Sequence, residues 1–179
     1  MVKVYTRKGD DGTTGLYGGG RVSKDSAAPT AYGSVDEAQA ALGVARAEVA
    51  SADELHGILV EIERDLWVLM AELATDPANR HKLVAGATQV TDEMVAALEA
   101  TIDEVSERFD PPTEFVVPGE TRTSALLDVA RTVVRRAERD AIAATVEGSQ
   151  VVPYLNRLSD LCWTLARWTE GTALIAKDV

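Results

Sequence analysis

The sequence predicts an all-α protein, a five-helix bundle that follows a glycine-rich N-terminal segment. After residue 30, apolar residues recur three and four positions apart, which is the period of amphipathic helices. The breaks between these stretches are short and carry proline, aspartate or glycine. Apart from a short extended segment at residues 2–5, nothing looks like part of a sheet. We therefore expect one domain over residues 1–179, with a loop at 1–25 and the bundle at 26–179.

Five helical stretches account for most of the chain. We expect helices at residues 31–49, 53–74, 91–109, 121–146 and 153–176. Thr91 is a suitable N-cap for the third helix, which two prolines after Asp110 bring to an end. Gly148 follows the fourth helix, as glycine often does. The second helix has an apolar stripe made of Leu55, Ile58, Leu59, Ile62, Leu66, Leu69, Met70 and Leu73.

Composition and charge exclude several classes of function. The formal charge of −11 gives little general attraction to nucleic acid or anionic lipid, so we expect neither nucleic-acid nor membrane partners. No apolar run is long enough to span a bilayer. The single cysteine, Cys162, cannot form an internal disulfide, which favours a cytoplasmic location. His56 and His81 lie in no metal-ligand spacing, so we expect no zinc site.

The N-terminal segment combines groups that suit a phosphate ligand. Residues 6–20 read TRKGDDGTTGLYGGG, and glycine lets backbone N–H groups turn inward around an anion. The cations at positions 7, 8, 21 and 24 add donors, and Asp10 or Asp11 could hold magnesium through water. The segment is not a Walker motif, because no glycine–lysine–serine/threonine run opens a helix. A flexible tail with turn-forming residues is the alternative interpretation.

The fourth helix separates apolar from charged side chains. We place on its apolar side Leu126, Val129, Ala130, Val133, Ala137 and Ala141. Arg131, Arg135, Glu138 and Arg139 gather opposite, where Glu138 could hold the Arg135 guanidinium by an ion pair. The charged side is either a solvated face or a triphosphate clamp, since guanidinium groups fit phosphate oxygens. A clamp would lie outside the core, covered by the N-terminal segment or a neighbouring subunit.

The fifth helix has a similar division. Its buried stripe is expected to hold Leu155, Leu158, Leu161, Cys162, Leu165 and Trp168. Its opposite side holds Asn156, Asp160, Trp163 and Arg167. A tryptophan among polar residues indicates either a contact surface or partial burial beneath a loop. Cys162 is expected to be a small core residue and not a nucleophile.

Four blocks of the chain resemble the ATP:cob(I)alamin adenosyltransferase family of the propanediol-utilisation type. Residues 6–25 read TRKGDDGTTGLYGGGRVSKD and resemble its nucleotide loop. Residues 31–43 read AYGSVDEAQAALG and resemble the opening of its first helix. Residues 115–140 read FVVPGETRTSALLDVARTVVRRAERD and resemble its corrin-facing segment and arginine helix. Residues 154–167 read YLNRLSDLCWTLAR and resemble its final helix.

The resemblance implies a ferritin-like bundle that assembles as a homotrimer with ATP between adjacent subunits. It implies transfer of the 5′-deoxyadenosyl group of ATP to the cobalt of cob(I)alamin, giving adenosylcobalamin and triphosphate. Magnesium would be carried by ATP, and a reductase and an adenosylcobalamin-dependent mutase would be handover partners. By position, the implied ATP contacts are Thr6, Arg7, Lys8, Gly9, Asp10, Gly12, Thr13, Thr14, Lys24, Arg135, Arg136, Glu138, Arg139 and Asn156.

The resemblance also implies roles in catalysis and corrin binding. Phe115 would lie against the lower face of the corrin, and Arg131 would pair with Asp36 across the subunit boundary. Cobalt is itself the nucleophile, so no serine, cysteine or histidine is needed to attack C5′. The implied cobalamin contacts are Phe115, Trp163 and Asp36. The implied catalytic residues are Arg135, Arg131, Asp36, Phe115 and Glu138.

The sequence departs from the family pattern at Glu120, in the first helix and, within a tolerant loop, at Lys8 and Asp11, and three other functions stay open. Glu120 stands where a small residue is usual, and the first helix reads DEAQ where DELN is typical. A corrinoid carrier would keep the apolar wall without the arginine clamp. A nucleotide-sensing trimer would keep the loop and the arginines without corrin contacts, and a purely structural bundle would need neither.

Overall fold

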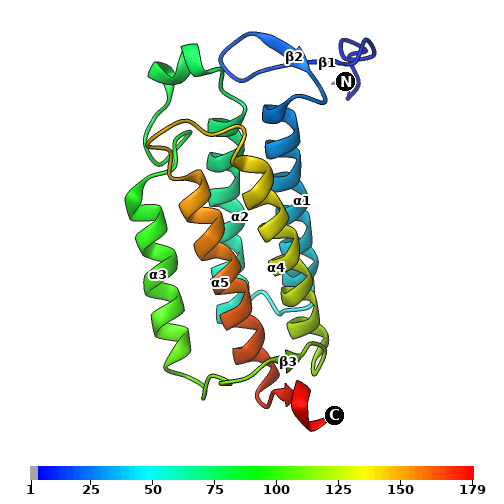
Figure 1. The fold of residues 1–179 in the computed structure, drawn as a ribbon, viewed down its shortest axis with the longest axis vertical. Helices are drawn as coiled ribbons and strands as arrows, with labels where there is room; N and C mark the ends of the chain where they lie inside the picture. Colours follow the sequence, from blue (N-terminus) through cyan, green and yellow to red (C-terminus); the bar gives the residue numbers. More distant parts are fainter. Residues whose placement is uncertain (1–3) are drawn as a thin grey trace.

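A computed structural model describes residues 4–179 and contains five long helices that run alongside one another (Figure 1). They are α1 (Ala27–Ala47), α2 (Glu54–Leu73), α3 (Asp92–Ser106), α4 (Arg122–Ala141) and α5 (Val151–Glu170). Two short 3-10 helices, η1 (Pro77–Lys82) and η2 (Ala176–Asp178), complete the helical content. The prediction of an all-α, five-helix bundle is confirmed. None of the described helices has both the length and the apolarity needed to cross a bilayer.

The core forms where the apolar faces of neighbouring helices meet. α1 packs against α2 and α4, while α5 packs against α4 and α3. Most of the α2 stripe is buried as expected, with Leu59, Leu66 and Leu69 fully enclosed, while Ile58 and Met70 are partly buried against the core. Cys162 also lies in the core, where burial raises the pKa of its thiol to about 12. The thiol is therefore a small core group, as the sequence predicted.

Several helix starts are determined by side-chain caps. Thr91 caps α3 as expected, because its Oγ1 accepts from the Met94 N–H. Thr121 and Ser124 form a reciprocal capping box at the start of α4, in which each hydroxyl accepts from the other residue's backbone N–H. The box fixes where α4 begins and so places the charged side chains further along it.

Two predicted helix ends are wrong by five or six residues, while α3 ends three residues early at Ser106 and α1 begins four residues early at Ala27. α4 ends at Ala141 and not at residue 146, because the chain turns and the Ser149 hydroxyl donates to Glu72 Oε1 on α2 at 2.7 Å. α5 ends at Glu170 and not at residue 176, because Gly171 adopts a φ of 73° that turns the chain out of the helix.

Four short strands correct the expectation that nothing beyond residue 5 forms a sheet. β1 (Thr13–Gly15) pairs antiparallel with β2 (Arg21–Ser23), and β3 (Val116–Val117) pairs antiparallel with β4 (Leu174–Ile175). The β1–β2 turn is made by glycines 18, 19 and 20, all with positive φ, which glycine adopts readily. The predicted extended segment at 2–5 begins with residues that lie outside the described part of the chain.

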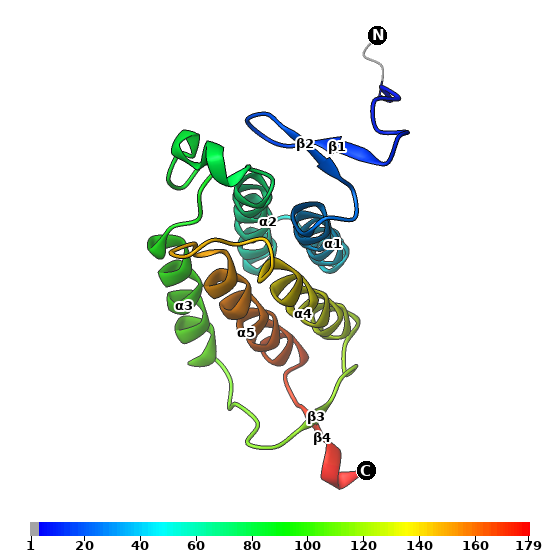
Figure 2. The ribbon, with the colours of Figure 1, turned by 45° about the horizontal axis from the view of Figure 1, so that its top comes forward.

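The two small sheets lie at opposite ends of the bundle. The β1–β2 hairpin extends beyond the end where α1 begins (Figures 1 and 2). The β3–β4 pair lies where α4 begins and α5 ends. The hairpin is tied to the bundle by the Tyr17 N–H, which donates to the Ala74 carbonyl oxygen at 2.8 Å. Lys82 Nζ on η1 also reaches the Gly18 carbonyl oxygen, at 3.3 Å.

Candidate active site

A first cavity, of about 370 Å³, is formed by the β1–β2 hairpin and the loop before it. We call it the head cavity. It brings together six of the residues predicted to contact ATP and adds Gly15 and Arg21, which the prediction omitted. The full lining is Thr6, Lys8, Gly9, Thr13, Thr14, Gly15, Arg21 and Lys24.

The head loop is closed by lysine and glycine contacts. Lys24 Nζ donates to the Gly9 carbonyl oxygen at 2.8 Å, and the Lys24 backbone N–H donates to the Gly12 carbonyl oxygen at 2.9 Å. A Cβ atom at Gly9 would lie only 3.0 Å from both Lys24 Nζ and the Thr13 carbonyl oxygen. Glycine at position 9 is therefore needed for this close approach of the two chain segments.

Arg21 organises the opposite wall of the head cavity. Its Nη2 donates to the Lys8 carbonyl oxygen at 2.7 Å, and its Nε donates to Thr13 Oγ1 at 3.1 Å. Asp11 Oδ1 accepts from the Thr13 N–H and hydroxyl, and these hydrogen bonds, with the Arg21 charge, lower the pKa of the Asp11 carboxyl. The signal for Arg21 was present in the sequence, where it is one of four cations around the glycines.

Three of the N-terminal residues predicted to contact ATP do not line the head cavity. Arg7 has a φ of 61° and its guanidinium lies 5.6 Å from the Tyr5 ring centroid. Asp10 and Gly12 belong to the turns of the same loop. The structure thus places them beside the head cavity and not in its wall.

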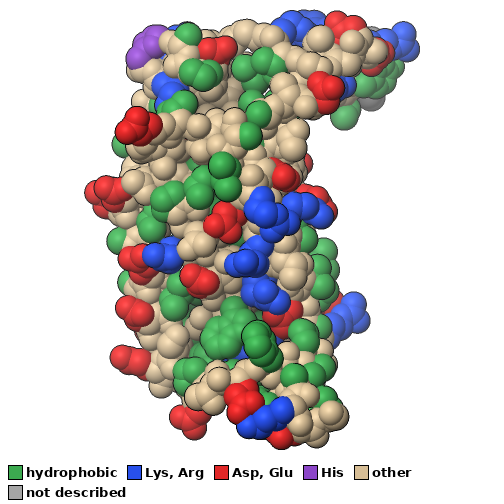
Figure 3. Space-filling view, in the orientation of Figure 1, with side chains coloured by type: hydrophobic (Ala, Val, Ile, Leu, Met, Phe, Trp, Pro, Cys, Tyr) green, Lys and Arg blue, Asp and Glu red, His purple; other side chains and the backbone are tan. Residues whose placement is uncertain are grey.

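Arg131, Arg135 and Arg139 follow one another at successive turns of α4, over about 12 Å of helix. We call this set the arginine column. Figure 3 shows basic side chains descending this face above a group of hydrophobic side chains. Arg135 and Arg139 are exposed, and Arg139 Nη1 donates to the Arg135 carbonyl oxygen at 2.9 Å. No α4 residue lines the head cavity.

The neighbours of the arginine column differ in part from the prediction. Glu138 accepts from Asn156 Nδ2 at 3.0 Å, so it joins α4 to α5 where an ion pair with Arg135 was expected. Arg136 pairs with Glu37 on α1. The predicted apolar side of α4 is correct for Ala130, Ala137 and Ala141, which are buried. Val129, however, is 54% exposed, and Val134 lies in the core in its place.

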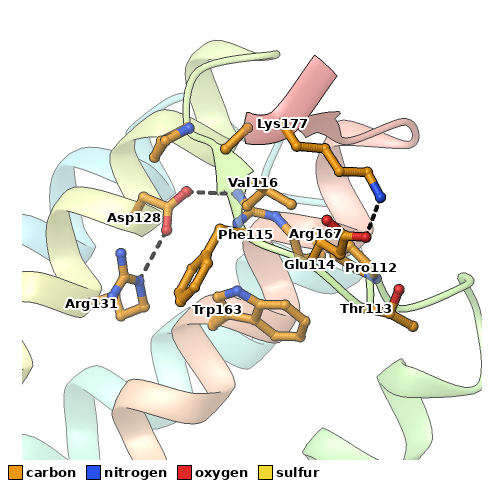
Figure 4. Close-up of a pocket in the computed structure, with 12 residues that line it drawn as sticks. Pro112, Thr113, Glu114, Phe115, Val116, Asp128, Arg131, Trp163, Arg167 and Lys177 are labelled. Carbon is orange, nitrogen blue, oxygen red and sulfur yellow. Dashed lines mark hydrogen bonds and ion pairs between the residues drawn. The ribbon is translucent and has the colours of Figure 1, made fainter. Parts of the chain in front are cut away.

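A second and larger cavity, of about 970 Å³, opens at the β3–β4 end of the bundle. We call it the lower cavity. Phe115 and Trp163 form its aromatic wall, and Figure 4 shows their rings next to each other, with Arg131 beside Phe115. The Phe115 side chain is 90% exposed. The full lining is Pro112, Thr113, Glu114, Phe115, Val116, Pro118, Asp128, Arg131, Trp163, Arg167, Ala176 and Lys177.

The floor of the lower cavity holds an ionic network that the sequence did not reveal. Asp128 Oδ1 accepts from Arg131 Nε at 3.0 Å, and its Oδ2 accepts from Arg167 Nη2 at 2.6 Å. Arg167 also pairs with Glu170 at 2.6 Å. Arg167 was expected on the polar side of α5 but is buried, since these carboxylates neutralise its charge inside the protein. Asp128 was not predicted as a site residue.

Asp36 lies away from both cavities. It is exposed on α1 and lines a groove of about 370 Å³ between α1 and α2, together with Trp67, whose surface is 66% exposed. Within one chain the partner of Arg131 is Asp128 and not Asp36. The structure therefore does not bring Asp36 together with Phe115 and Trp163 in a single chain.

Comparisons with known proteins agree on one family. The family described as cobalamin adenosyltransferase matches residues 4–169. The chain is 42% identical to the corrinoid adenosyltransferase of Citrobacter freundii, over 96% of this chain and 97% of that protein. It is also 42% identical to the corrinoid adenosyltransferase of Mycobacterium tuberculosis H37Rv, over 93% of this chain and 88% of that protein.

Solved structures extend the same likeness to the fold. A variant of the PduO-type ATP:corrinoid adenosyltransferase from Lactobacillus reuteri, in complex with cobalamin and ATP, superimposes with a TM-score of 0.87 at 28% identity. The match covers 98% of this chain and 97% of that one. The chain belongs to the cobalamin adenosyltransferase family.

Proposed function

We propose that this protein transfers the 5′-deoxyadenosyl group of ATP to the cobalt of a cob(I)alamin-type corrinoid and releases triphosphate. The observation that carries the proposal is the arginine column, whose lower end at Arg131 lines the aromatic lower cavity. An anion-binding surface thereby adjoins a large cavity with apolar walls. That combination suits a reaction between a polyphosphate nucleotide and a large planar ring.

The head cavity is the proposed phosphate cradle. Lys8 and Lys24 line it with the hydroxyls of Thr6, Thr13 and Thr14, so charged and neutral donors surround a space large enough for phosphate groups. The close fit at Gly9 keeps the loop in this shape. Residues 1–25 would thus act as the nucleotide-binding segment of one domain that continues as the bundle over 26–179.

The arginine column is the proposed clamp for the departing triphosphate. Arg135 and Arg139 present exposed guanidinium groups one turn apart, and the hydrogen bond from Asn156 holds Glu138 between α4 and α5. Negative charge on the triphosphate grows as the C5′–oxygen bond breaks. Fixed positive groups at that position stabilise the transition state more than the bound substrate.

The aromatic wall has a different proposed role. Phe115 and Trp163 would lie against the corrin and keep water from the lower face of the cobalt. Cobalt without a lower axial ligand accepts an electron more readily, and the Co(I) state supplies the electron pair that attacks C5′. The protein then contributes positioning and exclusion of water, with no protein nucleophile.

The head cavity and the arginine column belong to different surfaces of one chain, which supports a shared site in a homotrimer. No α4 residue lines the head cavity, so a neighbouring subunit would supply the clamp. Asp36 and Trp67 on the α1–α2 groove would face that neighbour. Among residues 4–179 no cluster of three acidic, histidine or cysteine side chains could hold a metal, so Mg²⁺ would enter with ATP.

Anaerobic spectroscopy tests the proposal. Purified protein is mixed with ATP, Mg²⁺ and chemically reduced cob(I)alamin, and the corrin absorbance is followed with and without ATP. We expect conversion to the spectrum of light-sensitive adenosylcobalamin only when both protein and ATP are present. Binding of ATP or corrinoid without conversion would contradict the proposal and favour a nucleotide sensor or a corrinoid carrier.

A further inference from the structure

We infer that Arg167 is a positioning residue, which orients Trp163 directly and Arg131 through Asp128 in the lower cavity. The inference rests on the proposed function and adds a residue to its corrin-binding side. Arg167 is on α5 and its side chain is only 1% exposed. It is one of the residues that line the lower cavity, and Figure 4 shows it joined to Asp128.

The first part of the argument is the way in which the guanidinium of Arg167 is held. Its Nη2 donates to Asp128 Oδ2 at 2.6 Å and to Glu170 Oε2 at 3.0 Å, while its Nε lies 2.6 Å from Glu170 Oε1 in an ion pair that lacks hydrogen-bond alignment. Two carboxylates on two helices thus grip one planar group. A planar fork held in this way has a fixed orientation that a lysine ammonium cannot reproduce.

The second part is what the fixed guanidinium contacts. Its central carbon lies 5.8 Å from the centroid of the Trp163 ring, within the range of a cation–π contact. Trp163 is only partly buried and needs a support on its inner side if the ring is to keep one orientation toward a ligand. The Arg167 guanidinium provides that support where it contacts the ring.

The third part is the bridge to the arginine column. One carboxylate, that of Asp128, accepts from Arg167 with one oxygen and from Arg131 Nε with the other. Asp128 is itself buried, so it must keep charged partners on both sides. Substitution of Arg167 therefore removes one partner of the Asp128 carboxylate and loosens the hold of that carboxylate on Arg131, even though Arg167 does not touch Arg131.

The test compares two lysine substitutions in steady-state assays with varied cob(I)alamin and varied ATP. For Arg167→Lys we expect the KM for the corrinoid to rise about tenfold, because the support of Trp163 and the grip on Asp128 are both lost. We expect the KM for ATP to rise by a smaller factor than the KM for the corrinoid, since Arg131 is one of three arginines in the column and the head cavity is at the other end of the bundle.

The matched control is Arg108→Lys. Arg108 has the same kinds of partner as Arg167 in a more exposed place, with carboxylates of Glu54 and Glu104 at 2.7 and 2.6 Å and the Trp168 ring centroid at 5.4 Å. It does not line the lower cavity. We expect both KM values of this variant to stay near those of the wild type.

A second measurement separates positioning from folding. Equilibrium titration of each variant with cob(II)alamin and no ATP reports corrinoid affinity without turnover, so it still tests Arg167 if the wild type proves inactive as a transferase. If Arg167→Lys does not fold, Glu170→Gln, which loosens the same guanidinium, takes its place. The inference would be overturned if Arg167→Lys lost affinity for ATP and for corrinoid equally, or if Arg108→Lys and Arg167→Lys had equal effects.

Discussion

The backbone N–H of Ala176 donates a hydrogen bond to the carbonyl oxygen of Phe115 at 2.8 Å. This bond continues the β3–β4 pairing, and the ion pair between Lys177 and Glu114 closes the same junction. The backbone of Phe115 is thereby fixed while its side chain stays in solvent. A backbone fixed before ligand binding leaves only the freedom of the side chain to be lost when the ligand arrives.

Replacing Phe115 with alanine removes most of the apolar wall and leaves the head cavity unchanged. We expect the KM for cob(I)alamin to rise about tenfold or more, because burial of a phenylalanine side chain is worth roughly 1.5–3 kcal/mol. The affinity for ATP, measured by calorimetry, should stay the same. Val84→Ala, which truncates another exposed apolar residue outside the lower cavity, is the control. A loss of ATP affinity alone would show that Phe115 does not serve the corrin.

Arg135→Ala removes the middle guanidinium of the arginine column. We expect turnover to fall by about 10²–10³-fold, as when one fixed donor to a developing negative charge is removed. The rate of adenosylcobalamin formation at saturating substrates measures the effect. The control is Arg122→Ala. Arg122 is on the same helix, pairs with Glu48 and lies outside the arginine column, so the turnover of this variant should be near normal. Near-normal turnover of Arg135→Ala would remove Arg135 from the catalytic residues.

Asp36 and Arg131 are expected to be partners across the subunit boundary, and a double-mutant cycle can test this. Asp36→Ala should weaken assembly and activity through loss of a carboxylate facing the neighbour. If the two residues pair, the double variant Asp36→Ala, Arg131→Ala should be little worse than either single variant. Sedimentation velocity over a range of concentrations measures assembly, and additive effects would contradict the pairing.

The stability of the bundle should depend on pH through Asp65. Burial raises the pKa of the Asp65 carboxyl, and the hydrogen bond from the Tyr154 hydroxyl at 2.9 Å offsets this only in part. The folded protein then holds this proton more tightly than the unfolded chain, whose value is 3.8. The contribution of Asp65 to stability is therefore present below pH 3.8 and is lost as the pH rises through the raised folded value.

The measurement compares urea unfolding of the wild type and Asp65→Asn from acidic to neutral pH. Asparagine keeps a carbonyl oxygen as acceptor for Tyr154 but carries no charge. We expect the free energy of unfolding of Asp65→Asn to rise relative to the wild type as the pH increases. Glu104→Gln changes an exposed carboxyl that pairs with Arg108 and is not among the charges that shift Asp65, so it serves as the control. A constant difference at every pH would contradict the expected titration.

The sequence was sufficient to predict the helices because their apolar period is long and uninterrupted. It also predicted most of the head cavity, since hydroxyls, cations and glycines within twenty residues must lie close together. Local patterns could not place Arg167, because its burial depends on two carboxylates, one of them on another helix. Helical angle alone also misplaced Val129, since the line dividing core from surface on α4 is decided by the way in which α1 and α5 pack against it.

The separation of the head cavity from the arginine column has a genetic consequence. If one complete site draws on two copies of the chain, a copy damaged only in the hairpin and a copy damaged only in the column are not equivalent defects. Each still carries the half that the other has lost. Two alleles that are inactive alone would then restore activity when expressed together, because every mixed assembly would contain an intact site.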